Sequence, residues 1–362
     1  MKILIMGFAK IKYMPYLRLY LDNIDSEKNE VHLLYWDRDI SKDTEIDLPV
    51  KKHLFSEVMD DEIPRYKKVS AFLRYAKTAK SLIEKEKFDF IVVLTSIPAV
   101  LIADVLLKSY KEKYIFDYRD FTYENFPVYK YTIGKLVKNS FFTVYTSEKH
   151  LKYLPKSEKL IVVRNFVTDF QLYRNAKNEI HKKTDEPVKI SYWGILRDEA
   201  FNKKIIDRFA KDKRFIVNFY GKKQRTVANL EKYCSEKQIE NIKFFGEYEE
   251  KDKYDFIKNT DILYNLYNIT GTEGMAMGNK FFDGVMFYIP QICTRGSFMG
   301  ENAEKYGVGK AIEPDSPNFC DDIYTYYNSI DKNTFINSCD KLTEQIMNEY
   351  NSVAEKIKNR LS

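Results

Sequence analysis

Short runs of apolar, largely β-branched residues recur along this chain, and each is followed by a longer stretch with helical periodicity. Strands that alternate with helices in this way are typical of a parallel sheet with right-handed crossover connections. In the first half we expect strands at residues 2–6, 31–36, 90–94, 114–117, 142–145 and 160–163, and helices at 14–24, 63–86 and 98–107.

The pattern restarts after a polar block, residues 171–187, that lacks apolar periodicity. Strands are expected at 188–193, 215–220, 242–245, 262–266 and 291–293, and the chain is helical after residue 316. The sequence therefore predicts an α/β protein with two Rossmann-like, doubly wound domains facing a cleft. The expected parts are a first domain at 1–165, a linker at 166–187, a second domain at 188–335, and C-terminal helices at 336–362 that pack back on the first domain.

Composition narrows the class of protein. The chain has no run of eighteen apolar residues and its apolar start is short, which argues against a spanning helix and a signal peptide. The four cysteines are scattered and form no CxxC, so neither a disulfide framework nor a structural zinc site is expected. These features predict a cytoplasmic protein.

Basic residues are concentrated in one window. Residues 65–87 hold eight basic and two acidic side chains, against a net charge of +6 for the whole chain. The window suits either an ordinary amphipathic helix or peripheral contact with the inner face of an anionic membrane. No basic stripe interleaved with aromatics crosses a domain, so nucleic acid is not an expected partner. The apolar positions at helical spacing are Val69, Phe72, Leu73, Ala76, Ala79, Leu82 and Ile83.

Glycine ends three predicted strands of the second half, at Gly194, Gly221 and Gly246. Ligands of open parallel sheets bind outside the carboxyl ends of the strands, where glycine permits a close backbone approach. The alternative is that each glycine only makes a tight turn. Gly7, after the first strand, does not begin a GxGxxG, and GxxxxGK[ST], HExxH and GxSxG are absent, so common dinucleotide, P-loop and hydrolase motifs are excluded.

Two groups of residues in the second half suit an anionic ligand. Arg197, Lys203 and Lys204 stand near the start of a helix, where cations favour a diphosphate, although a solvated helix face is the plainer interpretation. Further on, a glycine-rich loop at 271–278 leads into a helix whose N–H groups would attract an anion. In that charge-poor helix Lys280 and Asp283 share one face, which favours a buried functional pair over a simple ion pair.

A third group lies in the first half. Asp117, Arg119 and Asp120 follow a predicted strand, so that they would stand at the carboxyl end of the sheet. Such a carboxylate–guanidinium–carboxylate group suits the binding of hydroxyls or the supply of a base. The alternative is a salt-bridge cluster between the domains.

Several of these segments resemble the GT-B glycosyltransferases of glycosyltransferase family 4, found in bacterial capsule and cell-surface polysaccharide clusters. Residues 117–120 (DYRD) are similar to the hydrophobic-x-R-D segment of the acceptor domain, 142–147 (FTVYTS) to the ad-v-i-t-x-S strand, and 161–167 (IVVRNFV) to the hinge. Residues 192–194 (YWG) resemble the y-x-G turn. The most specific match is 278–290 (GNKFFDGVMFYIP), which resembles P-x-K-x-x-E-x-x-x-x-G-x-P.

The resemblance implies transfer of a sugar from a nucleotide-sugar donor, with UDP as the expected nucleotide, to a glycan or lipid-linked acceptor in surface polysaccharide synthesis. It further implies retention of the anomeric configuration, no metal and no cofactor. Arg197 and Lys203 would neutralise the leaving diphosphate, which is usually a large catalytic effect, and Asp283 would hold the ribose hydroxyls. The other expected donor contacts are Gly194, Lys204, Gly221, Glu273, Gly278, Asn279 and Lys280.

On the acceptor side the resemblance points to Gly7 and Arg119, with Asp120 or Asp117 as the base of an inverting enzyme. The chain departs from the family pattern because Asp283 stands in place of Glu, and because Glu273 and Asp283 do not have the E-x7-E spacing. Two alternatives therefore stay open. One is a non-catalytic partner of the same fold, and the other is a nucleotide-sugar epimerase.

Overall fold

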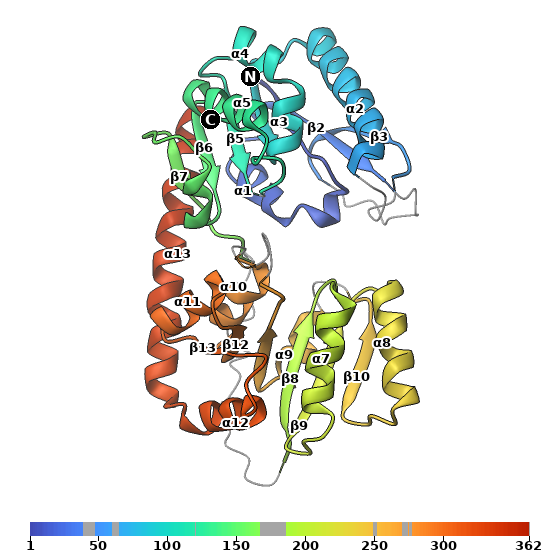
Figure 1. Cartoon of the computed structure of the whole chain (residues 1–362). Coiled ribbons are helices and arrows are strands. Elements are labelled where there is room, and N and C mark those ends of the chain that lie inside the picture. Colours follow the sequence, from blue (N-terminus) through green and yellow to red (C-terminus); the bar gives the residue numbers. More distant parts are fainter. Residues whose placement is uncertain are drawn as a thin grey trace. The chain divides into compact units, whose positions relative to one another are not determined.

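The computed structural model describes residues 1–38, 48–59, 65–119, 121–166, 186–248, 252–269, 274 and 277–361. The chain divides into two compact units (Figure 1). Unit 1 comprises Met1–Arg164 and Ile346–Ser362, and unit 2 comprises Asn165–Gln345.

The described part of unit 1 contains a seven-stranded parallel sheet with the order β3-β2-β1-β4-β5-β6-β7. The strands are β1 (Lys2–Met6), β2 (Glu30–Asp37), β3 (Lys51–Ser56), β4 (Phe90–Leu94), β5 (Tyr114–Tyr118), β6 (Phe142–Tyr145) and β7 (Leu160–Val162). The helices are η1 (Ile11–Tyr13), η2 (Pro15–Leu17), α1 (Arg18–Leu21), α2 (Arg65–Glu86), α3 (Ser96–Leu101), α4 (Ala103–Ser109), α5 (Pro127–Asn139) and η3 (Glu148–Lys152).

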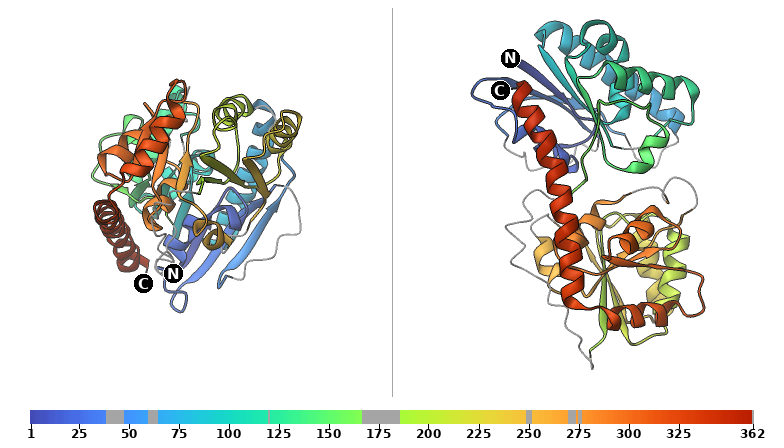
Figure 2. Two further views of the ribbon diagram at one scale, coloured as in Figure 1. Left: turned by 90° about the horizontal axis from the view of Figure 1, so that it is seen from below. Right: turned by 90° about the vertical axis from the view of Figure 1, so that its left-hand side faces the viewer.

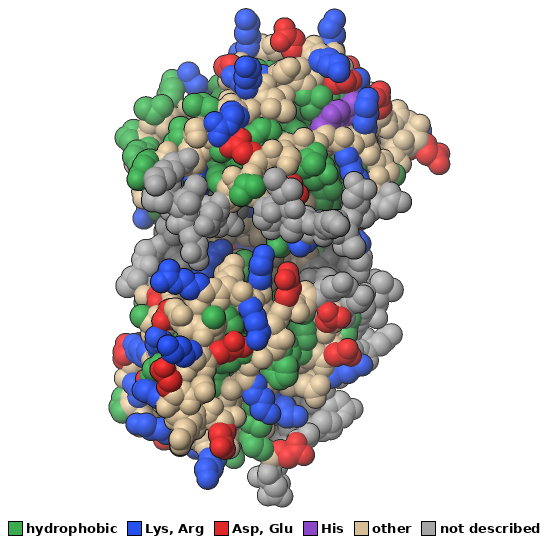
Figure 3. Space-filling model, turned by 90° about the vertical axis from the view of Figure 1, so that its right-hand side faces the viewer, with side chains coloured by type: hydrophobic (Ala, Val, Ile, Leu, Met, Phe, Trp, Pro, Cys, Tyr) green, Lys and Arg blue, Asp and Glu red, His purple; other side chains and the backbone are tan. Residues whose placement is uncertain are grey.

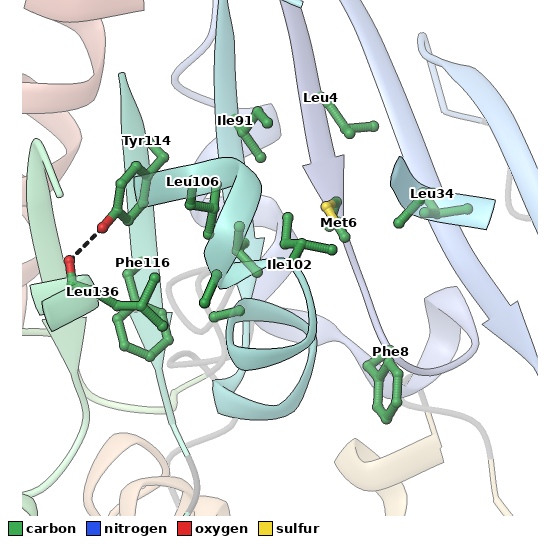
Figure 4. Close-up of a cluster of buried hydrophobic side chains, with 14 of the residues drawn as sticks. Leu4, Met6, Phe8, Leu34, Ile91, Ile102, Leu106, Tyr114, Phe116 and Leu136 are labelled. Carbon is green, nitrogen blue, oxygen red and sulfur yellow. Dashed lines mark hydrogen bonds between the residues drawn. The ribbon is translucent and has the colours of Figure 1, made fainter. Parts of the chain in front are cut away.

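Successive side chains of a strand point to opposite faces of a sheet, and both faces of this sheet are apolar. Along β1, Leu4 and Met6 pack in one core with α2, α3, α4 and α5 (Figure 4). Ile3 and Ile5 point into the second core, with α1 and the end of α13 (Lys332–Leu361). Covering both faces explains why the strands have continuous apolar runs in the sequence.

The described part of unit 2 contains a six-stranded parallel sheet with the order β10-β9-β8-β11-β12-β13. Its strands are β8 (Val188–Trp193), β9 (Phe215–Tyr220), β10 (Ile242–Gly246), β11 (Ile262–Asn265), β12 (Gln291–Thr294) and β13 (Gly309–Ile312). Its helices are α7 (Glu199–Phe209), α8 (Arg225–Glu236), α9 (Lys253–Ile257), α10 (Asn279–Met286), α11 (Phe298–Lys305) and α12 (Phe319–Ser329). The chain runs outward from β8 through β9 to β10 and then crosses to β11 on the other side of β8, so β8 and β11 flank the switch point of the sheet.

The predicted fold class, α/β with two Rossmann-like sheets, is confirmed. The division between the units falls inside α13, a single helix of 30 residues (Figure 2). Val353, Ile357 and Leu361, in the last turns of this helix, pack in the core of unit 1.

Several element predictions are wrong in detail. The expected helix at 14–24 is the short pair η2 and α1, and the one at 98–107 is divided at Ile102 into α3 and α4. Strands β3 and β13 were not predicted. β3 lies at the edge of its sheet and leaves Leu54 half exposed, so it lacks the apolar run that reveals a buried strand.

Candidate functional site

Three glycines at the carboxyl ends of neighbouring strands of unit 2 are held together by their backbones. Gly194 donates its N–H to the Tyr220 carbonyl at 2.9 Å, and Gly221 donates to the Gly246 carbonyl at 2.7 Å. A Cβ on Gly221 would lie 2.0 Å from the Gly194 carbonyl oxygen, and Gly194 has a φ of +125°. Only glycine fits either position without displacing the other. Contact between strand ends therefore accounts for Gly221 without a ligand.

A cavity of about 310 Å³ lies beside Gly194, at the switch point of the sheet. It is formed by the loops that follow β8 and β11 together with the first turns of α7 and α10. Most of its lining is apolar, and two cations, Arg197 and Lys280, face it. Its lining residues are Tyr192, Ile195, Leu196, Arg197, Asp198, Phe201, Asn202, Leu266, Tyr267, Asn268, Gly278, Lys280 and Met299.

Lys280 is held in the cavity by aromatic rings. Its Nζ lies 4.1 Å from the ring centroid of Tyr192 and 5.3 Å from that of Tyr267. Burial lowers the pKa of Lys280 to about 7; the carboxylate of Asp283 opposes this shift, whereas Lys253 and Arg197 add to it. Lys280 is partly buried and Arg197 is exposed. Together the two cations give the cavity a positive potential, which attracts an anion.

The loop that carries Arg197 is fixed by hydrogen bonds that the sequence analysis missed. Asp198 has left-handed backbone angles (φ 52°) and caps α7, because its carboxylate accepts the Phe201 N–H at 3.0 Å. The same side chain accepts a hydrogen bond from Asn268 at 2.8 Å, and Asn202 donates to the Arg197 carbonyl at 2.5 Å. An aspartate immediately before the start of a helix is a recognisable N-cap signal, but nothing in the sequence indicates its partner Asn268.

Two of the predicted phosphate-binding lysines point elsewhere. Lys203 pairs with Glu199 one turn earlier on α7, at 2.6 Å, and lies over the ring of Tyr233. Lys204 pairs with Asp315 at 2.5 Å. Neither side chain lines the cavity, so of the three predicted cations after β8 only Arg197 reaches it.

At the start of α10, Gly278 is the N-cap, Asn279 begins the helix, and Gly278 and Lys280 line the cavity. Asp283, one turn further on, is only 2% exposed. Its carboxylate accepts hydrogen bonds from the Trp193 indole at 2.8 Å and from Lys253 at 3.4 Å, so it does not face the cavity. Glu273 lies outside the described residues.

The predicted acceptor residues of unit 1 lie in its interior. Asp117 is fully buried; it pairs with Arg119 at 2.9 Å and accepts the Tyr20 hydroxyl at 2.7 Å. The ring of Tyr16 covers the Arg119 guanidinium at 4.2 Å. This is the salt-bridge alternative, formed within one unit, and a carboxylate so enclosed does not suit a base that must reach an acceptor.

Gly7 is likewise enclosed, because a Cβ there would lie 2.4 Å from the Met14 sulfur. Its carbonyl accepts the Tyr75 hydroxyl at 2.7 Å. Asp120 lies outside the described residues. In the part of the chain that the structure describes, no three His, Cys, Asp or Glu side chains are grouped to hold a metal ion. None of the described helices is long and apolar enough to cross a membrane.

The sequence matches no protein-family model and no curated protein. Solved structures, in contrast, match over the whole chain. Sucrose-phosphate synthase from Thermosynechococcus elongatus has a TM-score of 0.71 at 10% identity, covering 99% of this chain and 97% of that chain. The Anabaena protein HepE, in complex with UDP and glucose, has a TM-score of 0.67 at 14% identity, covering 99% and 100%.

A third match is a UDP-GlcNAc 2-epimerase from Neisseria meningitidis bound to UDP-GlcNAc, with a TM-score of 0.57 at 13% identity. It covers 96% of this chain and 100% of that chain. At these identities the likeness shows the fold and nothing finer. The chain has the GT-B fold, in which two Rossmann-like units follow one another in sequence.

Proposed function

We propose that this protein is a glycosyltransferase that takes its sugar from a nucleotide-sugar donor, with the diphosphate of the donor bound in the cavity of unit 2. The observation that carries the proposal is the pair of cations, Arg197 and Lys280, in a largely apolar cavity at the switch point of a parallel sheet. The match to HepE, described with UDP and glucose, supports UDP as the nucleotide.

The residues of the cavity suit a leaving diphosphate. Arg197 can bind phosphate oxygens with its planar fork, and Lys280 adds a point charge beside it. The N–H groups at the start of α10 add a further positive potential at Gly278 and Asn279. Cations that are already in place when charge develops on a leaving group lower the barrier without reorganisation.

The finer features of the proposal rest on the sequence resemblance. They are retention of the anomeric configuration, independence of a metal ion, and a glycan or lipid-linked acceptor in surface polysaccharide synthesis. If the enzyme inverts, Asp120 is the proposed base, since Asp117 is enclosed by Arg119 and Tyr20.

Thermal unfolding in the presence of nucleotides tests the donor site. The Tm is compared with UDP, GDP, ADP and CMP. A ligand that binds the native state and is present at about 100 times its Kd stabilises that state by about 2.7 kcal/mol, which raises the Tm by several degrees. We expect UDP to raise the Tm, Arg197→Ala to abolish the rise, and the matched variant Lys204→Ala to retain it. No rise with any nucleotide would contradict the proposal.

We also propose peripheral contact with an anionic membrane through α2. Most of the predicted apolar face of this helix is buried in unit 1, but Tyr66, Val69 and Leu73 are exposed by 73%, 50% and 60%. Residues 65–83 contain six Lys and Arg and no acidic side chain. Figure 3 faces this side of unit 1, where Lys and Arg stand beside apolar side chains. Apolar side chains among cations are typical of binding to anionic lipid.

Cosedimentation with vesicles tests this contact. We expect binding to phosphatidylglycerol vesicles, little binding to phosphatidylcholine vesicles, and loss of binding when Tyr66, Val69 and Leu73 are all changed to Ser. Phe245→Ser, which removes an exposed ring of unit 2, is the control and should bind as the wild type does. Equal binding by the triple variant would contradict the contact.

The match to a 2-epimerase favours nucleotide-sugar epimerisation as the second candidate. Proton NMR of UDP-GlcNAc incubated with the protein alone separates the two. A new 2-epimer without release of UDP would support the epimerase, whereas release of UDP and free sugar would support the transferase.

A further inference from the structure

Asp283 is a buried charge whose partners all belong to the protein. The side chain is 2% exposed, Trp193 is 1% exposed and Lys253 is 7% exposed. Trp193 is the last residue of β8, Lys253 begins α9, and Asp283 belongs to α10. One carboxylate therefore ties together three elements, of which β8 and α10 contribute residues to the cavity.

A ribose ligand would have to reach a carboxylate that is enclosed in the protein beside these partners. The Asp283 Oδ2 accepts both the Trp193 indole N–H, at 2.8 Å, and the Lys253 ammonium, at 3.4 Å. Breaking a buried ion pair is costly because the remaining charge is left without compensation. Asp283 is also not among the residues that line the cavity, although Lys280, three residues before it, is.

The carboxylate acts instead on the charge of Lys280. Lys280 packs against the rings of Tyr192 and Tyr267, and a Cβ on Gly194 would lie 3.4 Å from its Nζ. Among the described residues, the ionic groups that act on it are Asp283, which favours its charged form, and Lys253 and Arg197, which disfavour it. Asp198, which does line the cavity, is engaged with Phe201 and Asn268.

We propose that Asp283 is a positioning residue: it fixes Trp193 and Lys253, supplies the negative charge that keeps Lys280 available as an ammonium for a diphosphate, and does not itself bind the nucleotide. This inference rests on the proposed donor site. Asp283 is then required for binding of the diphosphate and makes no contact with the ribose.

The charge of Lys280 can be followed without any ligand. The pH dependence of acetic anhydride labelling, read by mass spectrometry of the peptide that holds Lys280, gives the midpoint of its titration. Asp283→Asn should lower this midpoint by about one pH unit, because a neighbouring counter-charge is removed. Lys253→Gln should raise it, because a like charge is removed. Asp255→Asn, which removes an exposed carboxylate of α9, should leave it unchanged.

The opposite signs separate an electrostatic role from a merely structural one, because a loosened fold would not move the midpoint up in one variant and down in the other. Should Asp283→Asn fail to fold, Lys253→Gln alone decides. An unchanged midpoint in Asp283→Asn, or a fall in Lys253→Gln, would overturn the inference.

Binding of inorganic pyrophosphate and of UDP completes the test. At pH 7.5 Asp283→Asn should bind both ligands about tenfold more weakly than the wild type, since the competent ammonium form is depleted by that factor. At pH 5.5 both ligands should bind within about twofold of the wild type. Weakened UDP binding with unchanged pyrophosphate binding would identify Asp283 as a ribose ligand and overturn the inference. If the wild type binds neither ligand, the proposed donor site fails, and the labelling experiment still decides the role of Asp283.

Discussion

The two units have related parallel sheets but differ at the carboxyl edges of their strands. In unit 1 the first strand ends at Gly7, against the Met14 side chain, and the neighbouring acid Asp117 is closed in by Arg119 and Tyr20. In unit 2 the corresponding edge opens into a cavity with two cations. In unit 1 Asp117, Arg119 and Tyr20 contact one another, whereas the cations at the cavity of unit 2 leave positive charge for a ligand.

This difference shows how the charges around a buried cation separate a structural cation from one that can bind an anion. Lys280 has aromatic rings and other cations around it, and burial works against its charge. Arg119 is more deeply buried, at 4% exposed, but it has a carboxylate as partner. A buried cation that is paired with its own counter-ion is a structural feature. A buried cation whose neighbours supply too little negative charge is a candidate for binding an anion.

The largest effect is expected from breaking the ion pair of unit 1. Asp117→Ala leaves the buried Arg119 without its partner and should lower the free energy of unfolding by about 3–5 kcal/mol, measured by urea denaturation. Tyr20→Phe, which removes only one hydroxyl, should cost about 1 kcal/mol. If Asp117→Ala has the same unfolding midpoint in urea as the wild type but has lost turnover, Asp117 is an acceptor-side base. The contrast drawn between the two units would then be wrong.

A smaller effect concerns acid stability. Burial lowers the pKa of His150 in unit 1 from 6.5 to about 4, so the folded protein keeps this ring neutral. The stabilisation is complete above pH 6.5 and is lost as the pH falls toward 4, by on the order of 3 kcal/mol, because the unfolded chain takes up the proton first.

His150→Phe, which keeps an aromatic ring against Tyr118, checks this expectation. Its free energy of unfolding should depend less on pH between 6.5 and 4 than that of the wild type. Identical pH dependence in the two proteins would show that His150 has the same pKa in the folded and the unfolded state, and would contradict this expectation.

The smallest effect is expected at Lys203, the predicted diphosphate ligand that the structure turns toward Glu199. A half-exposed ion pair within one helix contributes little, and the side chain does not face the cavity. Lys203→Ala should therefore bind UDP within about twofold of the wild type, by fluorescence titration. If Lys203→Ala loses as much UDP affinity as Arg197→Ala does, Lys203 is a ligand of the diphosphate and the site extends beyond the cavity.

The sequence predicts the fold well because buried parallel strands have unmistakable apolar runs. β4, β6, β8 and β9 begin and end at the predicted residues. The edge strand β3 escapes prediction because one face of it meets solvent. The break between α3 and α4 was not predicted because Ile102, where it occurs, is neither glycine nor proline.

The site is less well predicted because motifs give residue types and spacing but not the direction of a side chain. Lys203 and Arg197 are six residues apart, and only the backbone turn at Asp198 decides that one faces the cavity and the other faces α8. Asp283 is predicted as a ligand from its pattern, yet its orientation is set by Trp193 and Lys253, which lie 90 and 30 residues away in sequence. Tyr192 belongs to the y-x-G resemblance, but that motif does not indicate that its ring packs against Lys280, and Tyr267 carries no motif signal in a chain with 28 tyrosines.

Isothermal titration calorimetry of UDP binding to the wild type, Lys280→Met and Lys204→Met tests the central claim most directly. The donor-site account predicts that UDP binds the wild type and Lys204→Met with similar affinity and binds Lys280→Met at least about tenfold more weakly, since a charge-assisted contact is lost. UDP affinity that is the same in all three proteins, or absent from all three, would contradict the assignment of the diphosphate to the cavity of unit 2.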